Sequence, residues 1–230
     1  HVRFSTLDSL SPVYVRQILH GVDYAHAMFI VSSKSGGTLE TLSLYHVIWE
    51  DVVRELGEQE AGKLFVAITD PGSDLERLAR ERSFRGVFLG EPTVGGRFSA
   101  LSVFGLVPAA LCGLDVRDMV ARAAEMERMC SQDSLNNPAV QLASFLITNL
   151  SPASANCFTY ISPQPGRVFG LWMEQLIAES LGKDGKGVVP HIEIDVNLLN
   201  HHQPMHPVVV YHTNADSTFD REASMLSPNV

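Results

Sequence analysis

Cysteine and positive charge are both scarce in this sequence. The 230 residues include three cysteines, Cys112, Cys130 and Cys157, at wide spacing. Because this spacing matches neither a disulfide framework nor a zinc motif, we expect reduced thiols in a cytoplasmic protein. Lysine and arginine together number 17, against 26 aspartates and glutamates, which gives a formal net charge of −9. This acidic balance argues against a general binder of nucleic acid or of membrane surfaces.

Long hydrophobic runs are also missing. No stretch of the sequence is long enough to span a bilayer, and no signal peptide is recognisable, so we expect no membrane partner. Hydrophobic residues nevertheless make up 45% of the chain, which allows a sizeable core in one large or two small domains. The chain begins at His1 rather than methionine and ends without a clear terminal element, which suggests an excised piece of a longer protein.

Short apolar runs alternate with helical patterns over the first ninety or so residues. Buried strands are predicted at 27–31, 64–68 and 86–89, and helices at 38–56 and 73–82. This alternation predicts an α/β fold in which helices flank a parallel sheet. In such sheets, ligands bind at the carboxyl ends of the strands.

Helical patterns dominate the middle of the chain, and the start of a second α/β unit follows. The apolar run 101–111 predicts a buried helix. Further elements are predicted as helices at 115–129, 138–150 and 167–181 and as strands at 157–161 and 208–211. A break at Ser151-Pro152 predicts a boundary between a first domain, 1–150, and an incomplete second one, 151–230.

Hydroxyls and glycines gather after the first predicted strand. Residues 32–41 read Ser-Ser-Lys-Ser-Gly-Gly-Thr-Leu-Glu-Thr and lie where a helix is predicted to begin. Free backbone N–H groups and the dipole at a helix start favour a phosphate there. The segment is not a P-loop, because the Gly-Lys-Ser/Thr spacing is absent. The alternative is a glycine turn with a serine or threonine N-cap.

Two glycines and an arginine follow the third predicted strand. Gly95 and Gly96 would let the backbone turn and pass close to a ligand. Arg97 carries a permanent charge whose shape suits oxyanions. Because a helix is predicted to follow, this turn is a candidate site for a small anion. A structural turn with a surface arginine is the alternative.

The predicted helix 167–181 carries a candidate base. Its apolar stripe places Glu179 at the stripe's edge near Trp172, with Gln175 one turn earlier on the same side. Apolar neighbours are expected to raise the pKa of the Glu179 carboxyl, and a raised pKa suits a general base. The alternative is an exposed glutamate on an amphipathic helix.

Taken together, these three segments resemble the glucose-6-phosphate isomerase family. Residues 33–41 resemble its sugar-phosphate loop, residues 94–99 its glycine-arginine signature, and residues 175–183 the segment that holds its base. The Gly-Lys-Asp-Gly-Lys-Gly stretch at 182–187 is most similar to bacterial forms, including those fused to a transaldolase. The resemblance implies two flavodoxin-like sugar-isomerase (SIS) subdomains, usually in a homodimer.

The resemblance also implies a phosphate anchor made of side chains and backbone. Ser33, Ser35 and Thr38 would hold the phosphate of a sugar. Lys34 would contribute mainly through its backbone, and Thr41 would lie nearby.

The implied reaction interconverts glucose 6-phosphate and fructose 6-phosphate without a metal or another cofactor. Glu179 would move a proton between C1 and C2 of the sugar. Arg97, with the amide of Gly96, would stabilise the enediolate, and Gln175 would form a hydrogen bond near the reacting end.

The family pattern is incomplete in this chain, and alternatives stay open. Members also use a ring-opening histidine and a C-terminal lysine, and the histidines between 201 and 212 do not resemble that motif. Pro204 breaks any helix that would align them, so we expect no metal site there. One alternative is a non-catalytic SIS module that binds a sugar phosphate as a regulator. Another is an isomerase of a different sugar phosphate, such as mannose 6-phosphate. The joint presence of Arg97 and Glu179 favours the enzyme.

Overall fold

The computed structural model describes residues 3–150, 156–162, 164–184, 186–193 and 207–211. The chain divides into two compact units, His1–Arg122 and Ala123–Val230. This division falls within helix α6 (Val116–Cys130), whereas the sequence pattern places a domain boundary at residue 150. The subdomain boundary at residue 150 stays a prediction.

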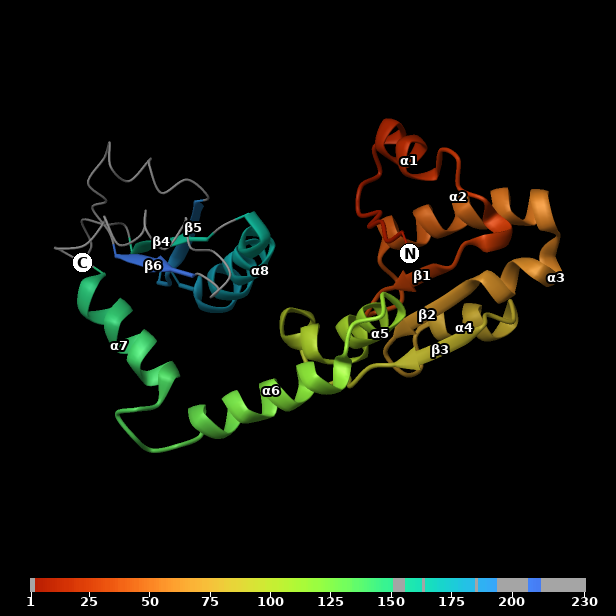
Figure 1. Cartoon of the computed structure of the whole chain (residues 1–230). Helices are drawn as coiled ribbons and strands as arrows, with labels where there is room; N and C mark the ends of the chain where they lie inside the picture. The colour runs from red at the N-terminus through yellow and green to blue at the C-terminus, as the bar shows by residue number, and fades with distance from the viewer. Residues whose placement is uncertain (1–2, 151–155, 163, 185, 194–206, 212–230) are drawn as a thin grey trace. The chain divides into compact units, whose positions relative to one another are not determined.

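A parallel three-stranded sheet is the frame of the first unit (Figure 1). Its strands are β1 (Phe29–Ser32), β2 (Phe65–Thr69) and β3 (Gly86–Leu89), in the order β1-β2-β3. Every residue of β2 is buried, as its unbroken apolar run predicts for the middle strand of a covered sheet. The expected α/β class and all three expected strands are therefore confirmed.

Helices precede, connect and follow these strands. Their bounds are α1 (Pro12–Leu19), α2 (Leu39–Leu56), α3 (Glu58–Ala61), α4 (Asp74–Glu81) and α5 (Val103–Leu111), and the 3₁₀ turns are η1 (Tyr24–His26), η2 (Gly62–Leu64) and η3 (Gly96–Leu101). Helix α4 begins where predicted because the Ser73 hydroxyl accepts a hydrogen bond from the amide of Glu76 (3.1 Å).

An aromatic core fixes α2 on this sheet. The ring centroid of Phe65 lies 5.5 Å from that of Tyr45, 5.4 Å from that of Trp49 and 5.3 Å from that of Phe84. Tyr45 and Trp49 lie one turn apart on α2, so one face of the helix is buried against β2. This packing holds the start of α2 at the carboxyl end of β1.

The expected buried helix at 101–111 is only partly correct. Residues 103–111 form α5, but none of them is buried, and Leu111 is 41% exposed. The physical reason is one-sided packing, because α5 contacts η3 and β2.

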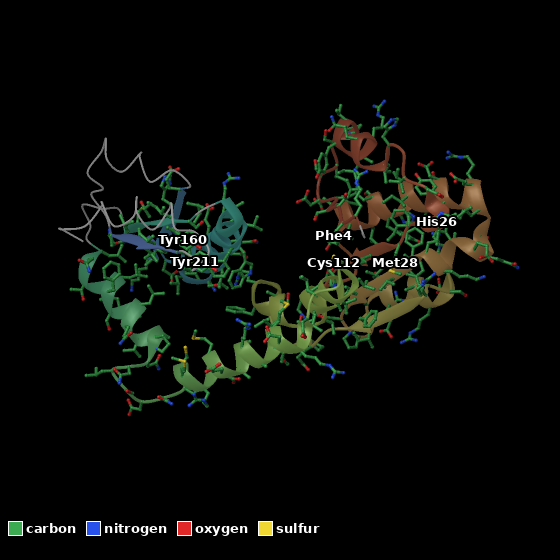
Figure 2. All side chains as sticks on the ribbon, in the orientation of Figure 1. Phe4, His26, Met28, Cys112, Tyr160 and Tyr211 are labelled. Carbon is green, nitrogen blue, oxygen red and sulfur yellow. The ribbon has the colours of Figure 1, made fainter. Side chains whose placement is uncertain are left out.

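The second unit has its own parallel sheet. Its strands are β4 (Cys157–Ile161), β5 (Val189–Glu193) and β6 (Val208–Val210), in the order β5-β4-β6, and its helices include α7 (Pro138–Asn149) and α8 (Gln164–Leu181). The sequence pattern missed β5, which pairs with β4 and has a proline as its second residue. Tyr160 and Tyr211 lie side by side in this unit, with stacked rings 6.2 Å apart (Figure 2).

Candidate anion and proton-transfer sites

The loop after β1 is closed by the hydroxyl of Ser33. This side chain is buried, and its Oγ lies 2.8 Å from Oγ1 of Thr38. The amide of Gly36 donates to the same Ser33 oxygen at 3.1 Å. The Ser33 amide donates to the carbonyl of Ile68 (3.0 Å), which extends the sheet pairing into the loop. The predicted hydroxyls of Ser33 and Thr38 are therefore brought together by a folded loop.

Gly36 is required by the geometry of this loop. Its φ of 70° is one that residues with a side chain rarely adopt. A Cβ on Gly36 would lie 2.6 Å from Cβ of Ser73, far inside the contact distance. The Ser73 hydroxyl in turn lies 2.8 Å from that of Thr69. The loop is thus packed closely against the start of α4.

The amino end of α2 faces the same hydroxyls. Thr38 is the N-cap residue of this 18-residue helix, and its Oγ1 bonds to Ser33 rather than capping the helix. The Gly37 amide lies 3.3 Å from Oγ of Ser35, an exposed side chain, and Thr41 lies within the first turn. Unpaired N–H groups at a helix start favour an anion, and hydroxyls add further donors. This arrangement can hold a phosphate group.

The side chain of Lys34 is engaged within the protein. Its Nζ donates to both carboxylate oxygens of Asp70 (2.8 and 2.7 Å) and to the carbonyl of Glu91 (3.0 Å). The Lys34 carbonyl accepts from the Asp70 amide at 3.1 Å. Sequence reasoning missed Asp70 and Glu91. Their positions in the sequence could have identified them, because each follows closely after a predicted parallel strand. The carboxyl ends of these strands lie at the same edge of the sheet as the loop after β1.

Arg97 lies in η3, as a half-buried side chain. The turn is braced by the Ser99 hydroxyl, which donates to the carbonyl of Gly96 at 2.6 Å. Gly95 has φ −62° and ψ 150°, which any residue adopts, so positive φ does not explain this glycine. A Cβ on Gly96 would have no heavy atom of the described residues within 4 Å. The backbone beside Arg97 is therefore accessible to a small ligand.

Gln175 and Glu179 form a pair on α8. Nε2 of Gln175 donates to Oε2 of Glu179 at 3.4 Å, and both side chains are exposed. The expected apolar stripe is half-buried at Leu176, whereas Trp172 is 38% exposed. The two side chains lie on one side of the helix, as their spacing predicts, and Glu179 is more exposed than an apolar surround would make it. Their catalytic roles stay predictions.

The site residues are divided between the two compact units. The Ser33 loop and Arg97 belong to the first unit, and Gln175 and Glu179 belong to the second. In the part of the chain that the structure describes, no cluster of three or more potential ligands could hold a metal ion. The histidines His201, His202 and His206 lie outside the described residues. Among the helices described, none combines the length and apolar character needed to cross a membrane.

Comparison with known proteins gives consistent matches. A family model described as phosphoglucose isomerase matches residues 1–200. The probable glucose-6-phosphate isomerase of Methanococcus maripaludis is 32% identical over 195 residues, which cover 84% of this chain and 43% of that protein. The glucose-6-phosphate isomerase of Methanocaldococcus jannaschii is 34% identical over 191 residues, covering 82% and 46% respectively. The chain thus spans less than half the length of these relatives.

Solved structures agree on the fold. A hypothetical protein of Thermus thermophilus superposes with a TM-score of 0.76 at 24% identity, over 98% of this chain and 49% of that one. A glucose-6-phosphate isomerase of Chlamydia trachomatis superposes with a TM-score of 0.65 at 21% identity, over 93% and 40%.

Proposed function

The chain belongs to the phosphoglucose isomerase family. From that premise we propose that it carries the sugar-phosphate site of an enzyme that interconverts glucose 6-phosphate and fructose 6-phosphate. The observation that carries this proposal is the closed loop between β1 and α2, where the Ser33 and Thr38 hydroxyls meet at a helix start. Such a site suits the dianionic phosphate that both sugars share.

The phosphate would be anchored away from the reacting carbons. The proposed donors are the hydroxyls of Ser33, Ser35 and Thr38 and the amides of the first turn of α2, with Thr41 at the margin. Binding energy from this remote group can be used to position C1 and C2 of the open-chain sugar. The anchor would therefore contribute to turnover as well as to affinity.

Glu179 would act as the base. Its carboxylate would take the proton from C2 of glucose 6-phosphate to give an enediolate, and would return it to C1 while a proton moves from O2 to O1. C2 is oxidised and C1 is reduced by the same electron pair, so no external oxidant or reductant is needed. The hydrogen bond from Gln175 places an amide next to the Glu179 carboxylate, and Gln175 would help to orient it.

Arg97 would stabilise the negative charge that develops in this step. A guanidinium holds a permanent charge and presents several N–H groups in one plane. The open backbone at Gly96 would let its amide approach the same oxygen. Arg97 belongs to the first compact unit and Glu179 to the second, so the role of each is proposed separately.

A coupled assay tests the proposal. Fructose 6-phosphate is converted to glucose 6-phosphate and detected through a dehydrogenase, with this chain and with a longer protein that contains it measured in parallel. Turnover in either form supports the enzyme. Binding of fructose 6-phosphate without turnover in both forms would favour the regulatory module, and turnover of mannose 6-phosphate alone would favour another sugar-phosphate isomerase.

The expected partners and location are part of the same proposal. We propose a cytoplasmic location, supported by the free thiols of Cys112 and Cys130, which suit a reducing compartment. The proposed homodimer rests on the family resemblance alone. A fused transaldolase, two SIS subdomains and the independence from metals also stay predictions from the family resemblance.

A further inference from the structure

Three loops of the first unit meet at one ammonium group. Lys34 follows β1, Asp70 follows β2 and Glu91 follows β3, and Nζ of Lys34 bonds to acceptors on both of the others. The partners are 36 and 57 residues away in the sequence. The Lys34 and Asp70 side chains are 24% and 20% exposed, so the pair is screened from solvent much more than a surface ion pair.

Most of the hydrogen-bonding capacity of this ammonium is used inside the protein. Nζ of Lys34 contacts both oxygens of the Asp70 carboxylate (2.8 and 2.7 Å), which share one N–H, and a second N–H reaches the Glu91 carbonyl at 3.0 Å. The surroundings are also tightly packed. The Phe104 ring centroid lies 5.8 Å from Nζ, and a Cβ on Gly90 would lie 2.5 Å from the Phe104 ring and 2.8 Å from Oδ1 of Asp70. Asp70, Glu91 and Phe104 therefore hold the ammonium in place.

The contact with Glu91 extends to the segment that carries Arg97. The Glu91 carbonyl accepts from Nζ of Lys34 and from the amide of Val94 (3.1 Å). The Glu91 side chain accepts from the Thr93 hydroxyl at 2.8 Å. The turn that leads into Gly95, Gly96 and Arg97 is therefore fixed at its first residue.

We propose that Lys34, with Asp70 as its partner, is a positioning residue that holds the phosphate loop and the Arg97 turn in one arrangement. It does so without contacting the phosphate. This inference deepens the proposed function and rests on it where the ligand is concerned. The two loops then respond together to any change at the ammonium.

A pair of substitutions separates positioning from direct binding. Asp70→Asn removes a negative charge near the proposed anion site, so electrostatics alone would strengthen phosphate binding. Positioning predicts the opposite: Lys34→Met and Asp70→Asn each weaken binding of fructose 6-phosphate about tenfold, because misplaced donors lose contacts. The double variant should be no weaker than either single variant.

Titration calorimetry on the 230-residue chain measures these affinities. Matched controls are Lys63→Met and Asp118→Asn, which remove the same charges from exposed ion pairs with Glu60 and Arg122. Both controls should bind like the unsubstituted chain. Unchanged or tighter binding in Asp70→Asn, with loss in Lys34→Met, would overturn the proposal in favour of direct contact.

Amide hydrogen exchange supplies a readout that needs no ligand. In Lys34→Met, exchange should rise in residues 33–37 and in residues 91–97 together, whereas Lys63→Met should change neither segment. A rise in only one segment, or in neither, overturns the positioning role. If the unsubstituted chain binds no fructose 6-phosphate but both segments respond, the proposed phosphate site fails while the structural coupling stands. Asp70→Asn, the milder change, serves the same exchange test if Lys34→Met does not fold.

Discussion

Single side chains supply the chemistry that this chain offers. On α8, Gln175 and Glu179 are four residues apart and share a hydrogen bond of 3.4 Å. In the first unit, the Ser33 hydroxyl has neighbours on both sides, the Thr38 hydroxyl and the Gly36 amide. These hydrogen bonds hold the loop in shape before any ligand binds. A bound phosphate would replace some of them with bonds of its own. Preorganisation of this kind lowers the cost of binding.

Replacement of Glu179 by glutamine tests the proton-transfer role. Glu179→Gln keeps the size and polarity of the side chain but removes the base. Turnover should fall about 10²–10⁴-fold, while the affinity for fructose 6-phosphate changes little. The coupled assay, on a form of the protein that converts fructose 6-phosphate, measures turnover. Calorimetry measures the affinity.

The matched control for this change is Glu174→Gln, also at an exposed position on α8. It removes the same charge from the same helix and should leave turnover unaffected. Full activity in Glu179→Gln would exclude the carboxylate as the base.

The loop after β1 packs closely against the start of α4. The loop after β1 passes Ser73 at a distance that leaves no space for a side chain at Gly36. Ser73 is itself the N-cap of α4, through its bond with the Glu76 amide. The loop shape and the helix start therefore depend on each other.

An alanine at Gly36 should disturb both elements. Gly36→Ala combines an unfavourable φ with a collision at Ser73, and we expect a loss of about 1–3 kcal/mol in the free energy of unfolding. Affinity for fructose 6-phosphate should fall as well, because the Gly36 amide holds the Ser33 hydroxyl. Urea unfolding and calorimetry measure the two effects.

The neighbouring glycine provides the control. A Cβ on Gly37 would meet no heavy atom of the described residues within 4 Å. Gly37→Ala should therefore leave the urea midpoint nearly unchanged. Equal losses of stability at Gly36 and Gly37 would contradict the packing argument.

The first unit as a whole is stabilised by aromatic packing around β2. Tyr45 is 2% exposed, and burial raises the pKa of its hydroxyl to about 12, although a hydrogen bond from Arg82 (2.7 Å) opposes the rise. The Arg82 guanidinium also lies 4.5 Å from the ring centroid of Trp49. A charged tyrosinate is thus disfavoured in the folded state.

Alkaline pH should destabilise this unit in a defined window. The pKa of Tyr45 is raised on folding, so the neutral side chain contributes to the free energy of unfolding. This contribution is fully present below pH of about 10 and is lost as the pH rises towards about 12. A pKa difference of about two corresponds to a loss of about 3 kcal/mol. Urea unfolding across this alkaline window measures it.

Tyr45→Phe isolates the contribution of this side chain. The variant loses the hydrogen bond with Arg82 at every pH, which lowers stability throughout. Above pH of about 10, the free energy of unfolding should fall less in this variant than in the unsubstituted chain. Identical pH dependence in both chains would show that Tyr45 does not ionise on unfolding in this range.

Local pattern predicted most of the elements. The strands at 27–31, 64–68 and 86–89 and the helix at 38–56 were recognised because period and length are properties of contiguous residues. Strand β5 was missed because its residues Val189–Glu193 include a proline and alternate little in hydrophobicity. Its identity as a strand depends on pairing with β4, which a local pattern does not contain.

For the candidate site, the sequence predicts positions along the helices, whereas the roles of the residues stay predictions. The placement of Gln175 and Glu179 on one side of α8 follows from helical spacing alone. The position of Thr38 at a helix start follows from the helical pattern of the residues after it. The expected burial of 101–111 was wrong, because burial depends on what packs against a helix and not on its composition.

The contacts of Lys34 separate what the local sequence determines from what only the folded chain determines. Residue types, helix starts and the family signatures are local, so the amino-acid sequence determines them without reference to distant residues. The meeting of Lys34 with Asp70 and Glu91 joins residues 36 and 57 positions apart. It exists because parallel pairing brings the carboxyl ends of β1, β2 and β3 to one edge of the sheet, and that alignment is a property of the folded chain.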